Sequence, residues 1–177
     1  MNSNNTDKLK LVCLDIETNG LALEDDILTI SVRLLNPDGT PTETEFYSMI
    51  YSEAKTNAEA FAVNGIKRED LLVSPKKERV IEDFLLWWAK TFEGAKVSPM
   101  GHNFLGFDKP RLERFFGNDW NRVFHYHSDD SMVIARALQR IGLLPVDSCS
   151  LKNLANFFGI KSEHAHNASA DTYQIPG

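Results

Sequence analysis

The stretch Leu9-Lys10-Leu11-Val12-Cys13-Leu14-Asp15-Ile16-Glu17 decides the fold class of this chain. Its apolar run is typical of a buried β-strand, and two acidic residues stand where that run ends. Alternate residues of a strand point to the same face, so Asp15 and Glu17 should present two carboxylates side by side. Two like charges that close repel each other unless a cation lies between them. The stretch therefore predicts a strand that carries a candidate cation site.

Two further motifs with acidic residues follow in the sequence. One is Gly101-His102-Asn103-Phe104-Leu105-Gly106-Phe107-Asp108, and the other is His166-Asn167-Ala168-Ser169-Ala170-Asp171. Together with Asp15 and Glu17 they supply four carboxylates and a histidine. Such a set indicates a site at which two metal ions assist the cleavage of a phosphodiester.

These motifs resemble those of the DEDDh group of 3′–5′ exonucleases, which includes polymerase proofreading subunits, RNase T and oligoribonuclease. Asp15-Ile16-Glu17-Thr18 matches the first motif of that group, Asp-x-Glu-Thr. Residues 102–108 match the second, His-Asn-x-x-Phe-Asp, with one additional residue, and His166 with Asp171 match the third, His-x4-Asp. The tyrosine-type sister group has Tyr where this chain has Asn167, so the histidine subtype is the better match.

The resemblance implies a role for each matched residue. Four acids would hold two Mg²⁺ or Mn²⁺ ions, which prefer hard oxygen ligands: Asp15, Glu17, Asp108 and Asp171. His166 would take a proton from the attacking water, a role suited to the imidazole pKa of about 6.5. Contacts with the substrate are expected from Thr18, Asn103, Ile66 and Phe107.

The coarse pattern of the chain predicts an α/β fold, a mixed central sheet with an antiparallel three-strand meander, flanked by helices. The resemblance implies that this is the RNase H-like architecture. After the first strand, turn signals separate two more β-patterned runs, and a helical pattern follows before a fourth strand. The expected strands are 27–32, 43–50 and 97–100, the expected helix is 77–92, and further helices should begin at Asp108, at Asp130-Ser131 and after Ser150.

Length and composition predict one domain of ordinary size. The chain has 177 residues, of which 42% are hydrophobic and 25% charged. We expect a flexible tail at 1–8 and a single exonuclease domain at 9–177, with a last helix shortened by Pro176 and Gly177. The two cysteines give no disulfide framework, the polar start lacks a secretory signal, and no apolar run spans a membrane. These features predict an intracellular, cytoplasmic protein.

The net charge of −6 argues against a general nucleic-acid coat protein, which would be basic. It is compatible with a nuclease, because bound cations would offset the carboxylates of the site. Lys109, Arg111 and Arg114 follow Asp108 and could hold backbone phosphates beside the metals. The alternative is that these residues form a solvated helix face.

Two other interpretations stay open at the level of sequence. An exonuclease fold can persist as a nucleic-acid-binding or partner-binding module with weak or no catalysis, although all four acids and the histidine are present here. His125-x-His127 and His164-x-His166 resemble pairs of zinc ligands, but no cysteine accompanies them. The expected partner is a nucleic acid with a free 3′ end, single-stranded DNA first and RNA second.

Overall fold

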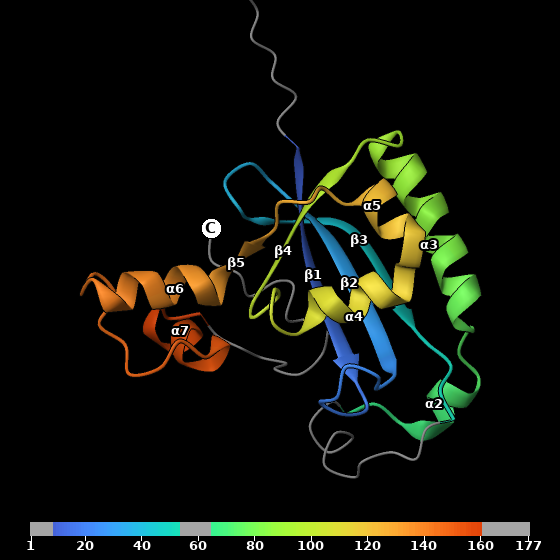
Figure 1. The fold of residues 1–177 in the computed structure, drawn as a ribbon, viewed down its shortest axis with the longest axis horizontal. Helices are drawn as coiled ribbons and strands as arrows, with labels where there is room; N and C mark the ends of the chain where they lie inside the picture. Colours follow the sequence, from blue (N-terminus) through green and yellow to red (C-terminus); the bar gives the residue numbers. More distant parts are fainter. Residues whose placement is uncertain (1–8, 54–64, 161–177) are drawn as a thin grey trace, which may run out of the picture.

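The computed structural model describes residues 9–53 and 65–160, which form a mixed sheet with helices beside it (Figure 1). The strand order is β3-β2-β1-β4-β5. The first three strands are antiparallel neighbours, while β4 runs parallel to β1, and β5 parallel to β4. The predicted mixed sheet with its antiparallel meander is confirmed. The strands are β1 (Lys10–Thr18), β2 (Ile27–Leu35), β3 (Pro41–Met49), β4 (Val97–Gly101) and β5 (Asp129–Asp130).

The helices begin close to where the sequence predicts them. The first turns at Lys77, Asp108, Ser131 and Leu151 all follow the expected signals. Three short elements were not predicted, because three to five residues are too few to show a helical period. The helical elements are α2 (Arg68–Leu72), α3 (Lys77–Phe92), α4 (Asp108–Phe116), the 3₁₀ turn η1 (Gly117–Asp119), α5 (Trp120–Val123), α6 (Ser131–Arg140) and α7 (Leu151–Phe157).

The main core lies between one face of the sheet and the layer formed by α3, α4 and α5 (Figure 1). From β1, alternate residues Val12, Leu14 and Ile16 enter this core. Phe84 of α3 packs against Phe124 just after α5, with ring centroids 5.9 Å apart. The period of two in β1 thus sends its apolar side chains to the helices and leaves the other face for polar residues.

Asp15 and Glu17 lie within β1, on the face opposite to that core. The strand is longer than its apolar run suggests, because it continues to Thr18. On the same face nearer the start of the strand, Cys13 contributes to a small apolar cluster with Leu35. The character of this face therefore changes along β1 from apolar to acidic.

A separate lobe, residues 131–160, contains α6 and α7 and projects beyond the β5 edge of the sheet (Figure 1). It has its own small core, built from Ala135, Leu144, Cys149 and Leu154. The sequence predicts an apolar face on α6, and that face exists but is exposed: it comprises Ile134, Ala137, Leu138 and Ile141, with Ile141 68% exposed. The pattern identified the helix correctly, but nothing in the described residues covers this face.

Two expectations from composition can be compared with the structure. Cys13 and Cys149 are both buried, and no disulfide joins them to each other. Within the described ranges, the helices are too short or too polar to cross a membrane. Neither observation bears on the residues outside those ranges.

Candidate active site

The first two acids lie side by side near the end of β1. Asp15 is opposite Ser31 of β2, and Glu17 is opposite Thr29. The pairing register shifts between Glu17 and Thr18, so that the last residue of β1 is displaced from the regular ladder. Such irregularities re-aim side chains and are common beside active sites. Both acids are half-buried, as the strand periodicity predicts for one shared face.

Asp108 is the first residue of α4 and is only 5% exposed. An acid at this position is commonly a helix cap, but here the N-cap is Phe107 and no side chain caps the helix. The backbone N–H of Ile16 instead hydrogen-bonds to the Asp108 carboxylate. The third acid therefore lies against β1, between the positions of the first two.

Burial and, to a smaller extent, the nearby charge of Glu17 raise the pKa of Asp108 to about 8. The hydrogen bond from Ile16 and the positive charge of Arg111 act in the opposite direction. In the metal-free protein at neutral pH this carboxyl therefore holds its proton. Two acids from distant motifs are thus close enough to oppose each other's ionisation, which is the condition under which a bound cation is favourable.

The donor set fits a divalent cation of the Mg²⁺ or Mn²⁺ type, because all three side chains offer carboxylate oxygens. Among the described residues, no group of three or more His, Cys, Asp or Glu side chains already has the geometry to hold a metal ion. The fourth predicted ligand, Asp171, lies outside the described residues. The case for a divalent cation at this site therefore rests on the carboxylate oxygens of the ligands and on the electrostatic repulsion between Asp108 and Glu17.

The second motif forms a tight loop between β4 and α4, and the buried carboxylate of Asp130 holds it. Asp130 is 4% exposed and accepts hydrogen bonds from the backbone N–H groups of Asn103 at 3.1 Å and Leu105 at 2.9 Å. The same carboxylate caps α6 by accepting from Met132 and Val133. Sequence analysis identified the start of this helix at residues 130–131 but not the link to the motif loop.

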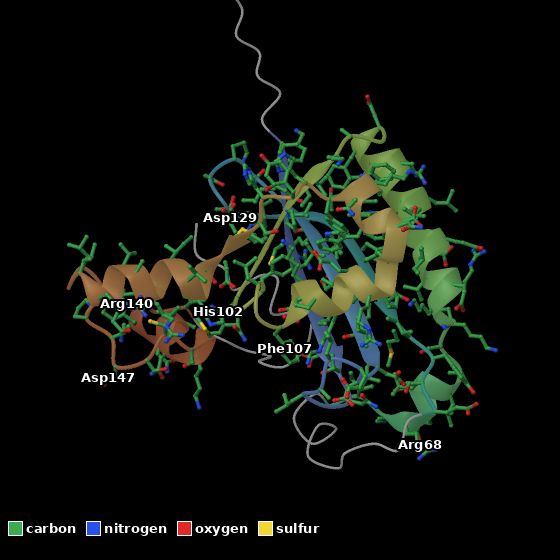
Figure 2. All side chains as sticks on the ribbon, in the orientation of Figure 1. Arg68, His102, Phe107, Asp129, Arg140 and Asp147 are labelled. Atoms are coloured by element: carbon green, nitrogen blue, oxygen red, sulfur yellow. The ribbon has the colours of Figure 1, made fainter. Side chains whose placement is uncertain are left out.

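His102 begins this loop and lies between the sheet and α6, whereas Phe107 stands at the start of α4 (Figure 2). The His102 Nδ1 atom is 3.0 Å from the Ser131 hydroxyl. Burial lowers the pKa of His102, and the charge of Asp130 opposes this effect. His102 is therefore neutral at pH 7 and serves the loop rather than carrying charge to the site.

The loop of residues 19–26, which follows the acids of β1, is closed by its own hydrogen bonds. Thr18 Oγ1 donates to the Gly20 carbonyl at 2.7 Å, and Ala22 N–H donates to Asp25 at 2.7 Å. A Cβ atom at Gly20 would stand 2.3 Å from the Asp25 carboxylate, so any other residue here would force the Asp25 side chain to move. The hydroxyl of Thr18 thus shapes the loop directly behind Glu17.

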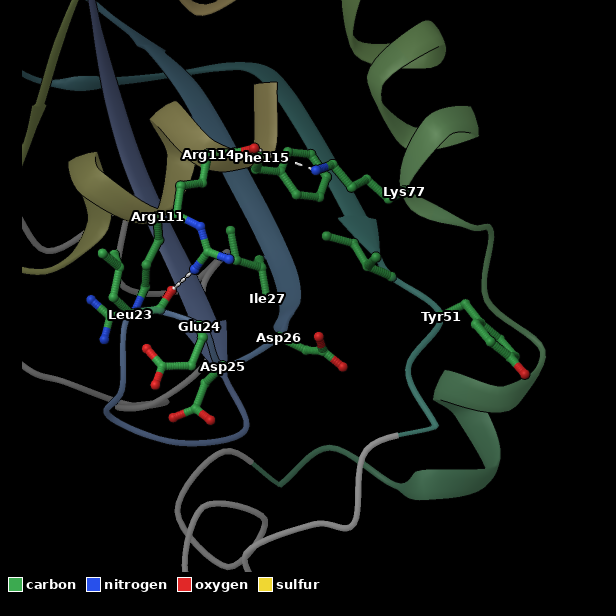
Figure 3. Close-up of a pocket in the computed structure, with 11 residues that line it drawn as sticks. Leu23, Glu24, Asp25, Asp26, Ile27, Tyr51, Lys77, Arg111, Arg114 and Phe115 are labelled. Carbon is green, nitrogen blue, oxygen red and sulfur yellow. Dashed lines mark hydrogen bonds between the residues drawn. The ribbon is translucent and has the colours of Figure 1, made fainter. Parts of the chain in front are cut away.

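Two of the basic residues after Asp108, Arg111 and Arg114, contact the loop of residues 19–26. Arg111 is 6% exposed and donates to the carbonyls of Leu21 and Ala22. Arg114 donates to the carbonyl of Leu23 (Figure 3). In the described structure, backbone carbonyls of the loop accept hydrogen bonds from both guanidinium groups, and a phosphate-binding role for these arginines stays a prediction.

A pocket of about 170 Å³ lies beneath this loop (Figure 3). Its lining includes Asp25 and Tyr51 together with the basic residues Lys77 and Arg114. None of the three described acids of the site contributes to it. The pocket is therefore distinct from the carboxylate cluster.

The structure describes the four residues that are predicted to contact the substrate, and this role stays a prediction. Asn103 is exposed and adopts a left-handed conformation with φ 57°, which Asn tolerates better than most residues. Phe107 is half-buried, and its ring lies 3.8 Å from the guanidinium carbon of Arg111. Thr18 is buried, and Ile66 is half-buried just before α2.

The predicted base His166, its neighbour His164 and the predicted ligand Asp171 lie outside the described residues. The other histidine pair, His125 and His127, is described, and its rings lie 5.1 Å apart. No third ligand joins that pair among the described residues. The zinc interpretation of His125-x-His127 thus gains no support from the described structure.

Comparison with solved structures identifies the fold. E. coli Exonuclease I in complex with a dT13 oligonucleotide superposes with a TM-score of 0.78 at 16% identity, covering 94% of this chain and 39% of that one. The same enzyme with a dA16 oligonucleotide gives a TM-score of 0.77 at 15% identity, again covering 94% of this chain and 39% of that one. A complex of Exonuclease I with SSB-Ct gives a TM-score of 0.73 at 13% identity, covering 94% of this chain and 40% of that one. The predicted RNase H-like α/β architecture is confirmed.

This chain spans about two fifths of the length of those structures. No curated protein matches its sequence significantly. The sequence model of the RNase T family of exonucleases, however, matches residues 12–175, nearly the whole chain. Because this match covers most of the chain, the protein belongs to this exonuclease family.

Proposed function

We propose that this protein is a metal-dependent 3′–5′ exonuclease that hydrolyses terminal phosphodiester bonds and releases nucleoside monophosphates. The observation that carries the proposal is the buried Asp108 carboxyl beside Glu17, two acids from motifs far apart in the sequence. A site that only stabilised the fold would gain little from placing two carboxyl groups where their negative charges repel each other. A cation site for phosphate chemistry explains why both are present.

Each residue of the site has a proposed role. Asp15, Glu17 and Asp108, with Asp171, would hold two Mg²⁺ or Mn²⁺ ions. When bound, such ions neutralise a scissile phosphate and lower the pKa of the attacking water. His166 would accept the proton of that water.

The polarity of the reaction is proposed to come from the end of β1. The backbone at Glu17 and Thr18 would bind the terminal 3′-hydroxyl, because a register shift and a tight loop fix this segment. Ile66, Asn103 and Phe107 would contact the terminal nucleotides. Intracellular, cytoplasmic action remains part of this proposal.

Single-stranded DNA, or a frayed 3′ end, is the first substrate to test. The support comes from structural relatives whose complexes contain dT13 and dA16 oligonucleotides. RNA is the second substrate, since the architecture of the site does not by itself distinguish the two sugars.

The decisive experiment is a degradation assay with 5′-labelled single strands of DNA and of RNA, with Mg²⁺, with Mn²⁺ and with chelator. Stepwise shortening from the 3′ end that stops in chelator is expected, and Asp15→Ala should abolish it. A circular single strand should remain intact. Cleavage of the circle, or shortening that persists in chelator, would contradict the proposal. Binding without any degradation would favour the alternative of an inactive binding module.

A further inference from the structure

Arg111 occupies an unusual position for an arginine on an amphipathic helix. It lies in the first half of α4, its side chain is only 6% exposed, and it points into the protein rather than into solvent. Taking a guanidinium out of water is unfavourable unless polar groups surround it. Arg111 must therefore make interactions that offset its burial.

Three backbone carbonyls surround this guanidinium. Nη1 donates to the carbonyl of Phe107 at 2.7 Å, and Nη2 donates to Leu21 at 2.5 Å and Ala22 at 3.0 Å. The guanidinium also lies over the ring of Phe107, with its carbon 3.8 Å from the centroid. Among the described residues, Arg111 forms no ion pair with a carboxylate, and its Nε atom has no hydrogen-bond partner.

These carbonyls belong to the two segments that carry the described acids. Leu21 and Ala22 lie in the loop directly after Glu17 and Thr18, and Phe107 directly precedes Asp108. Some 90 residues separate the loop carbonyls from Arg111 in sequence, so no local structure brings them together. One planar group thus joins the loop that follows β1 to the start of α4.

Arg111 also brings a positive charge to the start of α4. Lysine could supply this charge, but not the planar fork that donates from two nitrogens while stacking on a ring. Substitution of Arg111 can therefore separate the effect of its positive charge from the effect of its planar hydrogen-bonding geometry.

We propose that Arg111 is a positioning residue, which clamps the loop directly after Glu17 and Thr18 to the Phe107–Asp108 start of α4 and thereby sets the spacing of the metal-binding acids. The inference rests on the proposed function for its consequence in catalysis, but the clamp itself is a property of the metal-free protein. Partners that orient metal ligands typically contribute 10- to 100-fold to metal affinity or activity.

The test compares Arg111→Met and Arg111→Lys with Arg114→Met. Methionine keeps the length of the apolar stem, and lysine keeps the charge. Arg114 is the matched control, because it lies on the same helix and donates to Leu23 of the same loop, but it is exposed and does not contact Phe107. Three readouts are needed: hydrogen–deuterium exchange without metal, the Mn²⁺ concentration that gives half of the thermal stabilisation, and kcat with KM.

Both Arg111 variants should exchange faster in residues 17–26 and 105–109, and should need about tenfold more Mn²⁺ for the same stabilisation. Their kcat should fall about 10- to 100-fold, while KM changes about threefold or less, because displaced ligands impair the transition state more than the binding of the strand. Arg114→Met should stay within about threefold of wild type in every readout.

Unchanged exchange in the Arg111 variants would overturn the clamp, and so would full rescue by lysine, since charge alone would then suffice. An equal defect in Arg114→Met would also overturn it, because any anchor of the loop would then serve. If the wild type degrades no nucleic acid, the proposed function fails, while the exchange and Mn²⁺ readouts still decide the clamp.

Discussion

At the scale of single residues, the described half of the site depends on one buried carboxyl. Asp108 has few reasons to be buried as an acid, since it does not cap α4 and Glu17 opposes its ionisation. Natural proteins accept such local penalties at sites where a ligand removes them. The residue therefore links the stability of the metal-free protein to pH.

We predict that Asp108→Asn stabilises the metal-free protein in a pH-dependent way. The pKa of Asp108 is about 8 in the folded state against an ordinary value of 3.8 for an aspartate side chain, so between these values the unfolded chain releases a proton that the fold retains. The stability of the wild type should therefore fall as pH rises through this window, a loss that asparagine avoids.

The measurement is the melting temperature of both proteins in chelator from pH 4 to pH 8. The two proteins should melt at similar temperatures near pH 4, which is the internal control. By pH 8 the melting temperature of the variant should exceed that of the wild type by about 4 °C or more. In a chain of this size, each kcal/mol of stability shifts the melting temperature by about 2–4 °C. A constant difference across the range would show that burial does not raise this pKa.

His166, and not His164, is predicted to be the general base, because only His166 has the His-x4-Asp spacing to Asp171. Loss of a general base typically lowers the rate 10²–10⁴-fold, so His166→Ala should fall in that range and His164→Ala should be nearly unchanged. The wild-type rate should also fall below pH of about 6.5 as the base is protonated. A larger defect in His164→Ala, measured on one single-stranded substrate with saturating Mn²⁺, would reverse the assignment.

At the scale of elements, the loop of the second motif depends on a neighbouring helix cap. The Asp130 carboxylate accepts from two N–H groups of that loop and two of α6, so one side chain fixes both. Buried donors that lose their acceptor are more unfavourable than the hydrogen bond itself was favourable. This coupling should make Asp130 important for stability although it is not a predicted metal ligand.

We predict that Asp130→Ala lowers the free energy of unfolding by about 2–4 kcal/mol, from the loss of a cap and of the loop acceptors. Asp130→Asn should lose less, because its one carbonyl oxygen still accepts. The adjacent Asp129 is exposed, and Asp129→Ala should stay within about 0.5 kcal/mol of wild type. Urea denaturation checks all three variants, and equal losses at 129 and 130 would contradict the structure.

At the scale of the whole molecule, two hydrophobic cores of unequal size divide the described residues. The main core joins the sheet to α3, α4 and α5, whereas the small one lies within the lobe of residues 131–160. Few buried apolar contacts give a region a low free energy of local opening. The lobe should therefore open more readily than the sheet.

We predict that backbone amides of α6 and α7 exchange with solvent at least about tenfold faster than those of β1 and β2. Leu154→Ala, in the small core, should speed exchange mainly in the lobe. Phe84→Ala, in the main core, should remove about 3–5 kcal/mol and speed exchange in the sheet as well. Uniform exchange across both regions would show that the molecule opens as one unit.

The sequence alone determined the features that depend on local pattern. The period of two places Asp15 and Glu17 on one face of β1, and the 3.6-residue period defines α3 from Lys77 to Phe92. The cap at Ser150 was likewise predicted from the sequence. In the structure its hydroxyl accepts a hydrogen bond from the backbone N–H of Asn153, three residues later. Residues only a few positions apart decide these features, so the order of amino acids is sufficient to predict them.

Only the tertiary structure decided which distant groups meet. The burial of Asp108 beside Glu17, the use of Arg111 as a clamp and the double role of Asp130 all join segments far apart in the chain. A basic residue that will donate to the carbonyls of a distant loop looks the same in sequence as one that faces solvent, which is why the sequence left the role of the α4 arginines open between phosphate binding and a solvated helix face. Hydrogen bonds between distant segments leave no local periodicity, and the packing of α4 against β1 creates them.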